Sequence, residues 1–414
     1  MKGRGVFISR YLLLLCVLLF IRPVEAAQKA ETVPLLLISL DGFRWDYCAL
    51  HPDETPNLRR LKAEGASARG LIPVFPSNTF PNHYSIATGL RPKNHGIINN
   101  NFFDPAVNRF FHSGQPVFNH EERWWGGEPI WITAVRQGKA SACYFWPGSE
   151  VELRGMRPTF WKPYDYSIPF EKRLDELMSW LKLPDQKRPA VITFYLEETN
   201  SVGHASGPDS PELAAAVKLL DLRVGAILAR AEAEHIALNL VVVSDHGMTS
   251  LSAERVVILD DYIDQTKVQV DFDGSVVGLR PFDGDIDALM AKLSRLPPEA
   301  KAFRREDLPS HLAVGSNPRQ PPVWIVASEG WHVDRRSLFN SARSRYMKGE
   351  HGYDPSLKSM RGILIVHGPA FKSGGVLIEE VENIHLYNLF CAVTNLVPAP
   401  NDGDDRLVRA LLAP

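Results

Sequence analysis

Four apolar segments, each followed by polar residues, constrain the fold of this chain more than any other feature. They run over residues 33–40, 191–195, 238–244 and 363–366, and Asp41-Gly42, Glu197-Glu198, Asp245-His246-Gly247 and His367-Gly368 follow them. Segments of this kind are typical of strands buried on both faces, and here helical patterns separate them. The order predicts an α/β fold with a doubly wound, mostly parallel sheet and helices on both faces, with its site at the strand ends.

The clearest helix is expected over residues 211–235. Ser210 precedes it, and apolar side chains recur at helical spacing through Leu213, Val217, Leu220, Val224 and Ile227, which we assign to packing alone. Residues 102–166 are rich in Trp, Gly and Pro, which indicates long loops that form either the walls of a site or a buried structural loop. The pattern weakens over about 254–347, where we predict an inserted smaller subdomain with a helix over 285–296.

The first 26 residues differ in kind from the rest. Lys2, Arg4 and Arg10 precede an apolar segment over 11–21, and Val24-Glu25-Ala26 offers a small-residue cleavage pattern. This arrangement predicts a signal peptide over 1–26 and one exported catalytic domain over 27–414, either periplasmic or secreted. The apolar segment is short for a membrane span, so we expect no stable span after its removal; an uncleaved anchor is the alternative.

Charge and cysteine content exclude two further classes of protein. The chain has 46 basic and 48 acidic residues and a net charge of −2, without the concentrated basic face that nucleic-acid binding needs. Cys48, Cys143 and Cys391 would remain after cleavage, which allows at most one disulfide and argues against a disulfide scaffold. Such sparse use of cysteine in an exported chain favours a bacterial periplasm. The oligomeric state is left open.

Residues 76–85 (PSNTFPNHYS) place a threonine at the predicted start of a helix. Ser77 or Asn78 can act as the N-cap, and Gly89 marks the end. The Thr79 hydroxyl would then lie beside free backbone N–H groups at the positive end of the helix dipole, which favours an anion such as a phosphate. The alternative is that Thr79 is an ordinary capping residue.

Five potential metal ligands occur along the chain, most of them at or near predicted strand ends. They are Asp41, His204, Asp245, His246 and His351. Each has a common structural explanation when it is taken alone. Carboxylate and imidazole side chains are the ligands that zinc takes in hydrolases, so their joint occurrence predicts a two-metal hydrolytic site.

Seven short segments together resemble a known family. They are 75–84 (FPSNTFPNHY), 88–92 (TGLRP), 95–100 (HGIINN), 203–204 (GH), 207–208 (GP), 244–248 (SDHGM) and 351–354 (HGYD). The combination resembles the nucleotide pyrophosphatase/phosphodiesterase family of the alkaline phosphatase superfamily, over about residues 36–403. It implies an alkaline-phosphatase-like fold and a compact bacterial-type member without the extra Cys-rich or nuclease-like domains.

The resemblance also implies two Zn²⁺ per chain and a nucleophilic threonine. The implied ligands are Asp41, Thr79, Asp245 and His246 for one zinc, and Asn200, His204 and His351 for the other. Thr79 would attack phosphorus to form a covalent nucleotidyl-threonine, and water would then release a nucleoside 5′-monophosphate. The implied partner is therefore a nucleotide.

Further substrate contacts follow from the same resemblance. Asn100, with the backbone N–H near Phe80, would stabilise charge on the non-bridging oxygen, and a neutral amide there suits a diester. Phe80 and Tyr164 would clamp the nucleobase, and Tyr195 would lie near that pocket. A turn is the alternative role for Asn100, and core packing is the alternative for the aromatic residues.

Position 200 departs from the family pattern, which has an aspartate there. Asn200 offers a neutral carbonyl oxygen, so the second zinc would lose a charged ligand, and Glu197 and Glu198 do not obviously replace it. Weaker zinc binding, a different metal and an impaired or inactive relative are all compatible with this change. Asn200 motivates one rival function, a non-catalytic binding protein with one zinc. The rival among enzymes is a lipid or choline phosphodiesterase.

Overall fold

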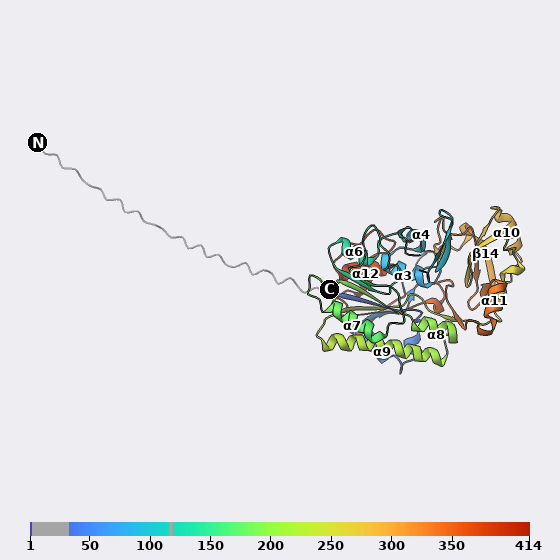
Figure 1. Cartoon of the computed structure of the whole chain (residues 1–414). Helices are drawn as coiled ribbons and strands as arrows, with labels where there is room; N and C mark the ends of the chain where they lie inside the picture. The colour runs from blue at the N-terminus through green and yellow to red at the C-terminus, as the bar shows by residue number, and fades with distance from the viewer. Residues whose placement is uncertain (2–32, 116–118) are drawn as a thin grey trace. The chain divides into compact units, whose positions relative to one another are not determined.

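The computed structural model describes Met1 and residues 33–115 and 119–414 (Figure 1). The predicted signal peptide, apart from Met1, lies outside the described residues, so its cleavage and the export of the chain stay predictions. Among the residues that are described, no helix combines the length and the apolar character that a membrane crossing requires. Cys48, Cys143 and Cys391 are all buried and unpaired, which agrees with the absence of a disulfide scaffold.

An eight-stranded sheet in the order β19-β2-β18-β9-β1-β8-β6-β7 forms the framework. β1 lies between β8 and β9 and is parallel to both. The bounds are β1 Leu35–Leu40, β2 Ala66–Ala68, β6 Ser141–Tyr144, β7 Phe160–Lys162, β8 Val191–Leu196, β9 Asn239–Val243, β18 Leu364–His367 and β19 Val376–Ile378. β18 runs antiparallel to both of its neighbours. The predicted mostly parallel sheet is confirmed; the direction of β18 was not foreseen because burial on both faces does not encode strand direction.

Helices cover both faces of this sheet, as predicted. Leu35 and Leu37 of β1 belong to a core shared with α3, α6 and α12, whereas Leu36 and Ile38 point to the opposite core with α2, α7 and α9. Figure 1 shows α3, α6 and α12 on one side of the sheet and α7 and α9 on the other. The bounds are α2 Pro56–Glu64, α3 Thr79–Thr88, α6 Ile130–Arg136, α7 Phe170–Leu181, α9 Pro211–Ala233 and α12 Leu386–Val393.

The longest helix, α9, matches its sequence pattern closely. The Ser210 hydroxyl accepts a hydrogen bond from the Leu213 backbone N–H, which completes the N-cap. All five apolar residues that define its predicted inner face are buried. Their assignment to packing alone therefore holds.

The aromatic region 102–166 contains more regular structure than expected. β4 (Asn101–Asp104) and β5 (Arg109–His112) form an antiparallel hairpin, and α6 follows. Trp124, Trp131 and Trp146 are fully buried in the core. The interpretation as a buried structural segment therefore fits these tryptophans better than an open lid, because their large apolar surfaces are already covered.

Residues 268–327 form a separate antiparallel sheet in the order β12-β13-β15-β14. Its strands are β12 Val268–Phe272, β13 Val276–Pro281, β14 Ala300–Arg304 and β15 Val323–Ala327, and α10 (Ile286–Leu293) packs on it. Asp285 is the N-cap of α10, so the predicted helix is present but shorter than expected. This sheet has its own buried cluster, which includes Val277, Leu289 and Ile325. Its status as an inserted subdomain over 254–347 stays a prediction.

Candidate functional site

Thr79 is the first residue of α3, at the helix start that the sequence predicts. Asn78 is the N-cap by position and has an extended backbone, and Gly89 ends the helix in a left-handed conformation with φ 69°. The Asn78 side chain does not cap the helix; its Nδ2 instead donates to Asn99 Oδ1 at 2.7 Å. Asn82 Nδ2 donates to the Asn78 carbonyl at 2.9 Å, which holds the preceding loop against the helix.

Three predicted metal ligands, Asp41, Asp245 and His246, meet beside Thr79. Their ligand atoms all lie within 4.8 Å of one another, at the ends of the adjacent strands β1 and β9. The His246 Nε2 atom is 3.1 Å from an Asp245 oxygen and 3.4 Å from an Asp41 oxygen. The same nitrogen lies 3.4 Å from the Thr79 hydroxyl. The structure thus brings the predicted nucleophile and the predicted first ligand set together.

The buried carboxylates of this first cluster favour a bound cation. Burial, together with the Asp245 charge, raises the pKa of Asp41. Burial opposes protonation of His246, yet Asp245 and Asp41 outweigh it and raise the His246 pKa to about 9. Two adjacent buried carboxylates are costly without a cation between them. The donor set and its charge therefore fit a divalent metal ion.

The second cluster contains His204 from α8 (Glu198–Ser206) and His351, which follows β17 (Gly349–Glu350). Their Nε2 atoms lie 3.1 Å apart, and their Nδ1 atoms lie 2.9 Å from the carbonyls of Gly349 and Ser77 respectively. A carbonyl accepts only, so each Nδ1 carries the proton and each Nε2 presents a lone pair. Burial and the neighbouring imidazoles keep the pKa of His351 well below its usual range. Facing lone pairs of this kind fit a shared metal ion.

The two clusters adjoin each other. The rings of His246 and His351 are stacked with their centroids 3.7 Å apart. Metal ions held by two adjoining clusters could act on the same phosphoryl group, one at the attacking oxygen and one at the leaving oxygen.

Asn200 lies one helical turn before His204 on α8, so the two side chains share a helix face. Its Oδ1 atom is buried and has no hydrogen-bond partner, and Oδ1 of Asp41 shares this condition. Buried oxygens without partners are uncommon, and a cation bound in each cluster would satisfy the oxygen beside it. Glu198 is ion-paired with Arg223, and Glu197 accepts a hydrogen bond from the Tyr164 hydroxyl. These contacts agree with the expectation that neither glutamate replaces the missing charge.

Asn100 is held by a network that sequence reasoning only partly anticipated. Its Oδ1 accepts from the Phe80 backbone N–H at 2.8 Å, and its own backbone N–H donates to Asn99 Oδ1 at 2.7 Å. The Phe80 N–H is thus committed to Asn100, and the Asn100 Nδ2 group remains as the donor for a ligand. Asn99 and Asn78 were not foreseen in this positioning role, although the run of three asparagines at 99–101 was a visible signal.

The three aromatic residues that are predicted to lie at the substrate site differ in how far they are exposed. Phe80 is partly buried against Phe111 and Trp125. Tyr164 is 49% exposed and packs beside Tyr195 with ring centroids 6.3 Å apart. Tyr195 is only 6% exposed, and its hydroxyl donates to Asp41 at 2.5 Å. This bond supports a role for Tyr195 in holding Asp41, a predicted metal ligand. Contact between Tyr195 and a substrate stays a prediction.

Two buried residues near the clusters were missed from the sequence. His83 Nδ1 lies 3.2 Å from an Asp245 oxygen, and its Nε2 lies 2.8 Å from the Ser39 hydroxyl, so this side chain buttresses Asp245. The signal was its position four residues after Thr79, on the same helix face. Glu350 offers a carboxylate oxygen that groups with His204 and His351. It directly precedes a predicted ligand.

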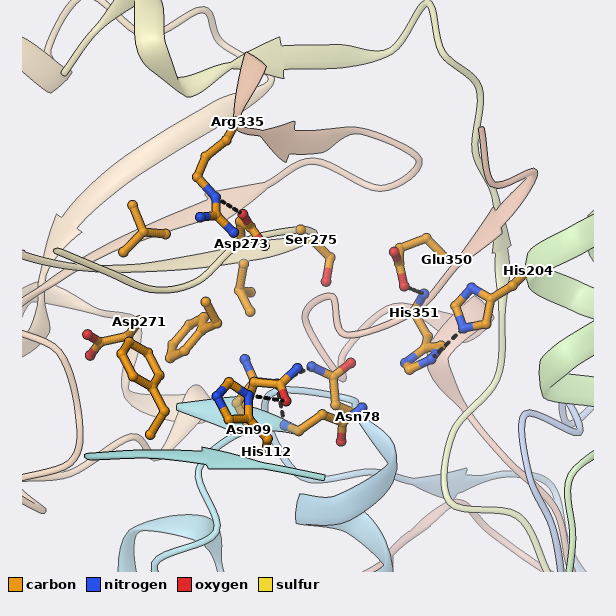
Figure 2. Close-up of a pocket in the computed structure, with 17 residues that line it drawn as sticks. Asn78, Asn99, His112, His204, Asp271, Asp273, Ser275, Arg335, Glu350 and His351 are labelled. Carbon is orange, nitrogen blue, oxygen red and sulfur yellow. Dashed lines mark hydrogen bonds and ion pairs between the residues drawn. The ribbon is translucent and has the colours of Figure 1, made fainter. Parts of the chain in front are cut away.

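A cavity of about 560 Å³ opens beside the second cluster. Figure 2 shows His204 and His351 at one end, Asn78 and Asn99 below, and Asp273 and Arg335 on the far wall. Arg335 Nε lies 2.7 Å from an Asp273 oxygen, so these two charges neutralise each other. The cavity has room for a substantial substituent of a phosphoryl group.

Comparison with known proteins gives a consistent result. Residues 35–354 match the family model "Type I phosphodiesterase / nucleotide pyrophosphatase". Venom phosphodiesterase of Macrovipera lebetinus is 38% identical over 393 residues, which cover 92% of this chain and 45% of the relative. Ectonucleotide pyrophosphatase/phosphodiesterase family member 1 of Homo sapiens is 38% identical over 394 residues, or 92% of this chain and 42% of the relative. The chain thus spans about half the length of the curated relatives it matches.

Solved structures support the fold. Murine ectonucleotide pyrophosphatase/phosphodiesterase 5 superposes with a TM-score of 0.86 at 33% identity, over 92% of this chain and 100% of that chain. A second structure of that murine protein, an inactive threonine-to-alanine variant in complex with AMP, also has a TM-score of 0.86, at 32% identity and with the same coverage of both chains. The alkaline-phosphatase-like α/β architecture expected from the sequence is confirmed.

Proposed function

The chain belongs to the type I phosphodiesterase/nucleotide pyrophosphatase family, and we propose that it hydrolyses phosphodiester or pyrophosphate bonds of nucleotides to release a nucleoside 5′-monophosphate. The observation that carries this proposal is the place of the Thr79 hydroxyl. It lies at the start of α3 and 3.4 Å from His246 Nε2, beside two adjoining metal-type clusters. The relatives named as phosphodiesterases, and the murine relative described as binding AMP, support the nucleotide class.

Two Zn²⁺ per chain are part of the proposal. Asp41, Asp245, His246 and the Thr79 hydroxyl would hold one ion, and His204, His351 and Asn200 would hold the other. The imidazole and carboxylate donors suit zinc. Bound zinc would act as a Lewis acid toward the phosphoryl oxygens and would lower the pKa of the Thr79 hydroxyl and of the hydrolytic water.

The reaction would proceed in two displacements at phosphorus. The Thr79 hydroxyl gives its proton to solvent water and Oγ1 attacks phosphorus. A bond forms between them, the bond from phosphorus to the leaving oxygen breaks, and the leaving group departs with that electron pair and takes up a proton from water as its pKa requires. Water then attacks the nucleotidyl-threonine, which frees Thr79 and the nucleoside 5′-monophosphate. The description of a murine relative as inactive after a threonine-to-alanine change supports a threonine nucleophile in this family.

The polar surroundings favour a diester over a monoester. Asn100 offers a neutral amide donor to the non-bridging oxygen, which suits the smaller charge of a substituted phosphoryl group. The cavity beside His204 and His351 gives room for the second ester substituent. Phe80 and Tyr164 offer ring surface for a nucleobase. Export to the periplasm or the exterior would place the enzyme with nucleotides outside the cytoplasm.

A substrate comparison tests this function. We expect purified protein with added zinc to hydrolyse the nitrophenyl ester of TMP faster than nitrophenyl phosphate, and to hydrolyse at least one of ATP, a dinucleotide and a nucleotide sugar. Thr79→Ala should remove this activity while the protein stays folded. A preference for the monoester would contradict the diesterase assignment. Turnover of lysophospholipid without turnover of nucleotides would favour a lipid phosphodiesterase, and a single bound zinc ion without any turnover would point to a non-catalytic binding protein.

A further inference from the structure

We propose that Glu350 supplies the anionic group of the second metal site, where Asn200 contributes only a neutral oxygen. The inference rests on the proposed function only in taking the cluster of His204 and His351 as a metal site. The reason for it is the lack of negative charge among the other ligands of the second metal site. Two neutral imidazoles and an amide give a divalent cation no negative partner, whereas hydrolase zinc sites with two histidines typically add a carboxylate.

The position of Glu350 is the first observation. One of its carboxylate oxygens and one ring nitrogen each of His204 and His351 all lie within 4.8 Å of one another. Figure 2 shows the Glu350 carboxylate beside His351, on the side of the cavity where His204 also lies. The residue is only 8% exposed, so water screens its charge weakly at this distance.

The backbone holds this carboxylate in place. Glu350 belongs to β17, which pairs in antiparallel register with β10 (Thr249–Ser250), so that Glu350 lies opposite Thr249. One carboxylate oxygen accepts from the His351 backbone N–H at 2.8 Å, and the other lies 3.2 Å from His332 Nε2. A carboxylate has about four acceptor positions. These two contacts fix its orientation and leave capacity for a further partner.

Other acidic residues near the site do not group with His204 and His351. Asp41 and Asp245 belong to the first cluster, Glu198 is paired with Arg223, and Glu197 accepts from Tyr164. Over residues 33–115 and 119–414, Glu350 is the acidic residue that groups with both His204 and His351. The negative charge at the second cluster is therefore assigned to Glu350.

Zinc binding, measured without substrate, tests this assignment. The full chain is loaded with zinc, and stoichiometry and affinity are determined by competition with a chromophoric chelator. We expect Glu350→Gln to weaken the second zinc by about 10–100-fold, the range for loss of a supporting carboxylate, and to leave the first zinc unchanged. Second-site affinity within twofold of the parent chain would overturn the proposal.

A matched variant separates charge from structural support. His332→Gln removes the imidazole of this buried ion pair but keeps an amide N–H donor for the Glu350 carboxylate. If Glu350 acts through its charge on the metal site, His332→Gln retains two zinc ions of near-parent affinity. If both variants lose the second zinc equally, the carboxylate has only a structural role and the proposal fails.

Restoration of the charge at position 200 gives a second, independent readout. In the Glu350→Gln background, Asn200→Asp should restore binding of the second zinc. The increase in second-site affinity should be at least threefold larger than the increase that Asn200→Asp gives in the parent chain. This comparison also holds if Glu350→Gln lowers stability, because the single variant Glu350→Gln and the double variant with Asn200→Asp both carry that substitution. Equal gains in the two backgrounds would overturn the proposal. Because no turnover is measured, a chain that binds two zinc ions but hydrolyses none of the nucleotide panel would refute the proposed function and not this inference.

Discussion

The backbone N–H of Phe80 donates a 2.8 Å hydrogen bond to Oδ1 of Asn100, and this bond joins the start of α3 to the loop that precedes β4. It orients the Asn100 amide so that its Nδ2 group is the free donor. In the proposed mechanism, Phe80 would therefore act on the substrate only through Asn100. The Asn100 amide alone would then carry the donor role that the resemblance implied for Asn100 and the Phe80 N–H together.

Asn100→Ala should therefore slow the chemical step more than it weakens substrate binding. We expect kcat for the nitrophenyl ester of TMP to fall by about 10²–10³-fold, in the range seen when one oxyanion donor is removed. KM should change little, because the donor acts mainly on charge that develops in the transition state. Steady-state kinetics check this, with zinc content as a control. A rise in KM at unchanged kcat would contradict the assignment.

Removal of metal should affect both activity and stability. The two Nε2 atoms of His204 and His351 face each other at 3.1 Å, and the buried carboxylates of Asp41 and Asp245 are balanced only by neighbouring histidines, so a bound divalent ion is expected to stabilise the folded chain. We expect chelation by EDTA to abolish hydrolysis and to lower Tm, and added zinc to restore both. His351→Ala should bind one zinc fewer than the parent chain. A Tm that is indifferent to EDTA would contradict the two-cluster account.

Much of this site could be read from the sequence because it lies at the ends of buried strands. Asp41 follows β1 and Asp245 follows β9, and these strands are neighbours in the sheet. An apolar segment followed by a polar residue indicates a strand end, so a short stretch of sequence is enough to predict where Asp41 and Asp245 lie. The predicted ligands on α8 and after β17 have no such strand pattern, and the family resemblance was needed to join them.

The features that the sequence did not reveal depend on contacts between distant segments. Glu350 is adjacent to His351, but its carboxylate is directed by His332 and by the pairing of β17 with β10. The hydroxyl of Tyr195 reaches Asp41 because β8 and β1 pair in register. The antiparallel direction of β18 is likewise set by how the chain returns to the sheet. Periodicity within one segment cannot report any of these.

Tyr164 is expected to contribute to nucleobase binding through its ring. It is 49% exposed beside the buried Tyr195, and base stacking on an aromatic ring contributes about 1–3 kcal/mol. Tyr164→Ala should raise KM for nucleotide esters about 10-fold with little change in kcat. Tyr164→Phe keeps the ring and loses only the hydrogen bond to Glu197, so its KM should stay close to the parent value. Equal KM values for the alanine and phenylalanine variants would rule out stacking.

His95 gives the folded state a predictable sensitivity to acid. It is fully buried; its Nδ1 accepts from the Ile97 backbone N–H at 3.1 Å, and its Nε2 lies 3.0 Å from the Ser85 hydroxyl. Burial, supported by the nearby Arg319 cation, lowers the pKa of His95 to about 3. The unfolded chain has a histidine pKa near 6.5, so it binds a proton over a pH range in which the folded chain does not.

The stability that neutral His95 contributes is therefore complete above about pH 6.5 and declines as the pH falls toward 3. Between pH 7 and pH 5 the loss amounts to about 2 kcal/mol in the free energy of unfolding. His95→Gln has no charge to gain, so the difference in stability between the parent chain and this variant should shrink by that amount at pH 5. Urea unfolding of both metal-free proteins at pH 7, 6 and 5 measures it. A difference that is independent of pH would show that His95 binds protons equally in the folded and unfolded chains, as an exposed imidazole would.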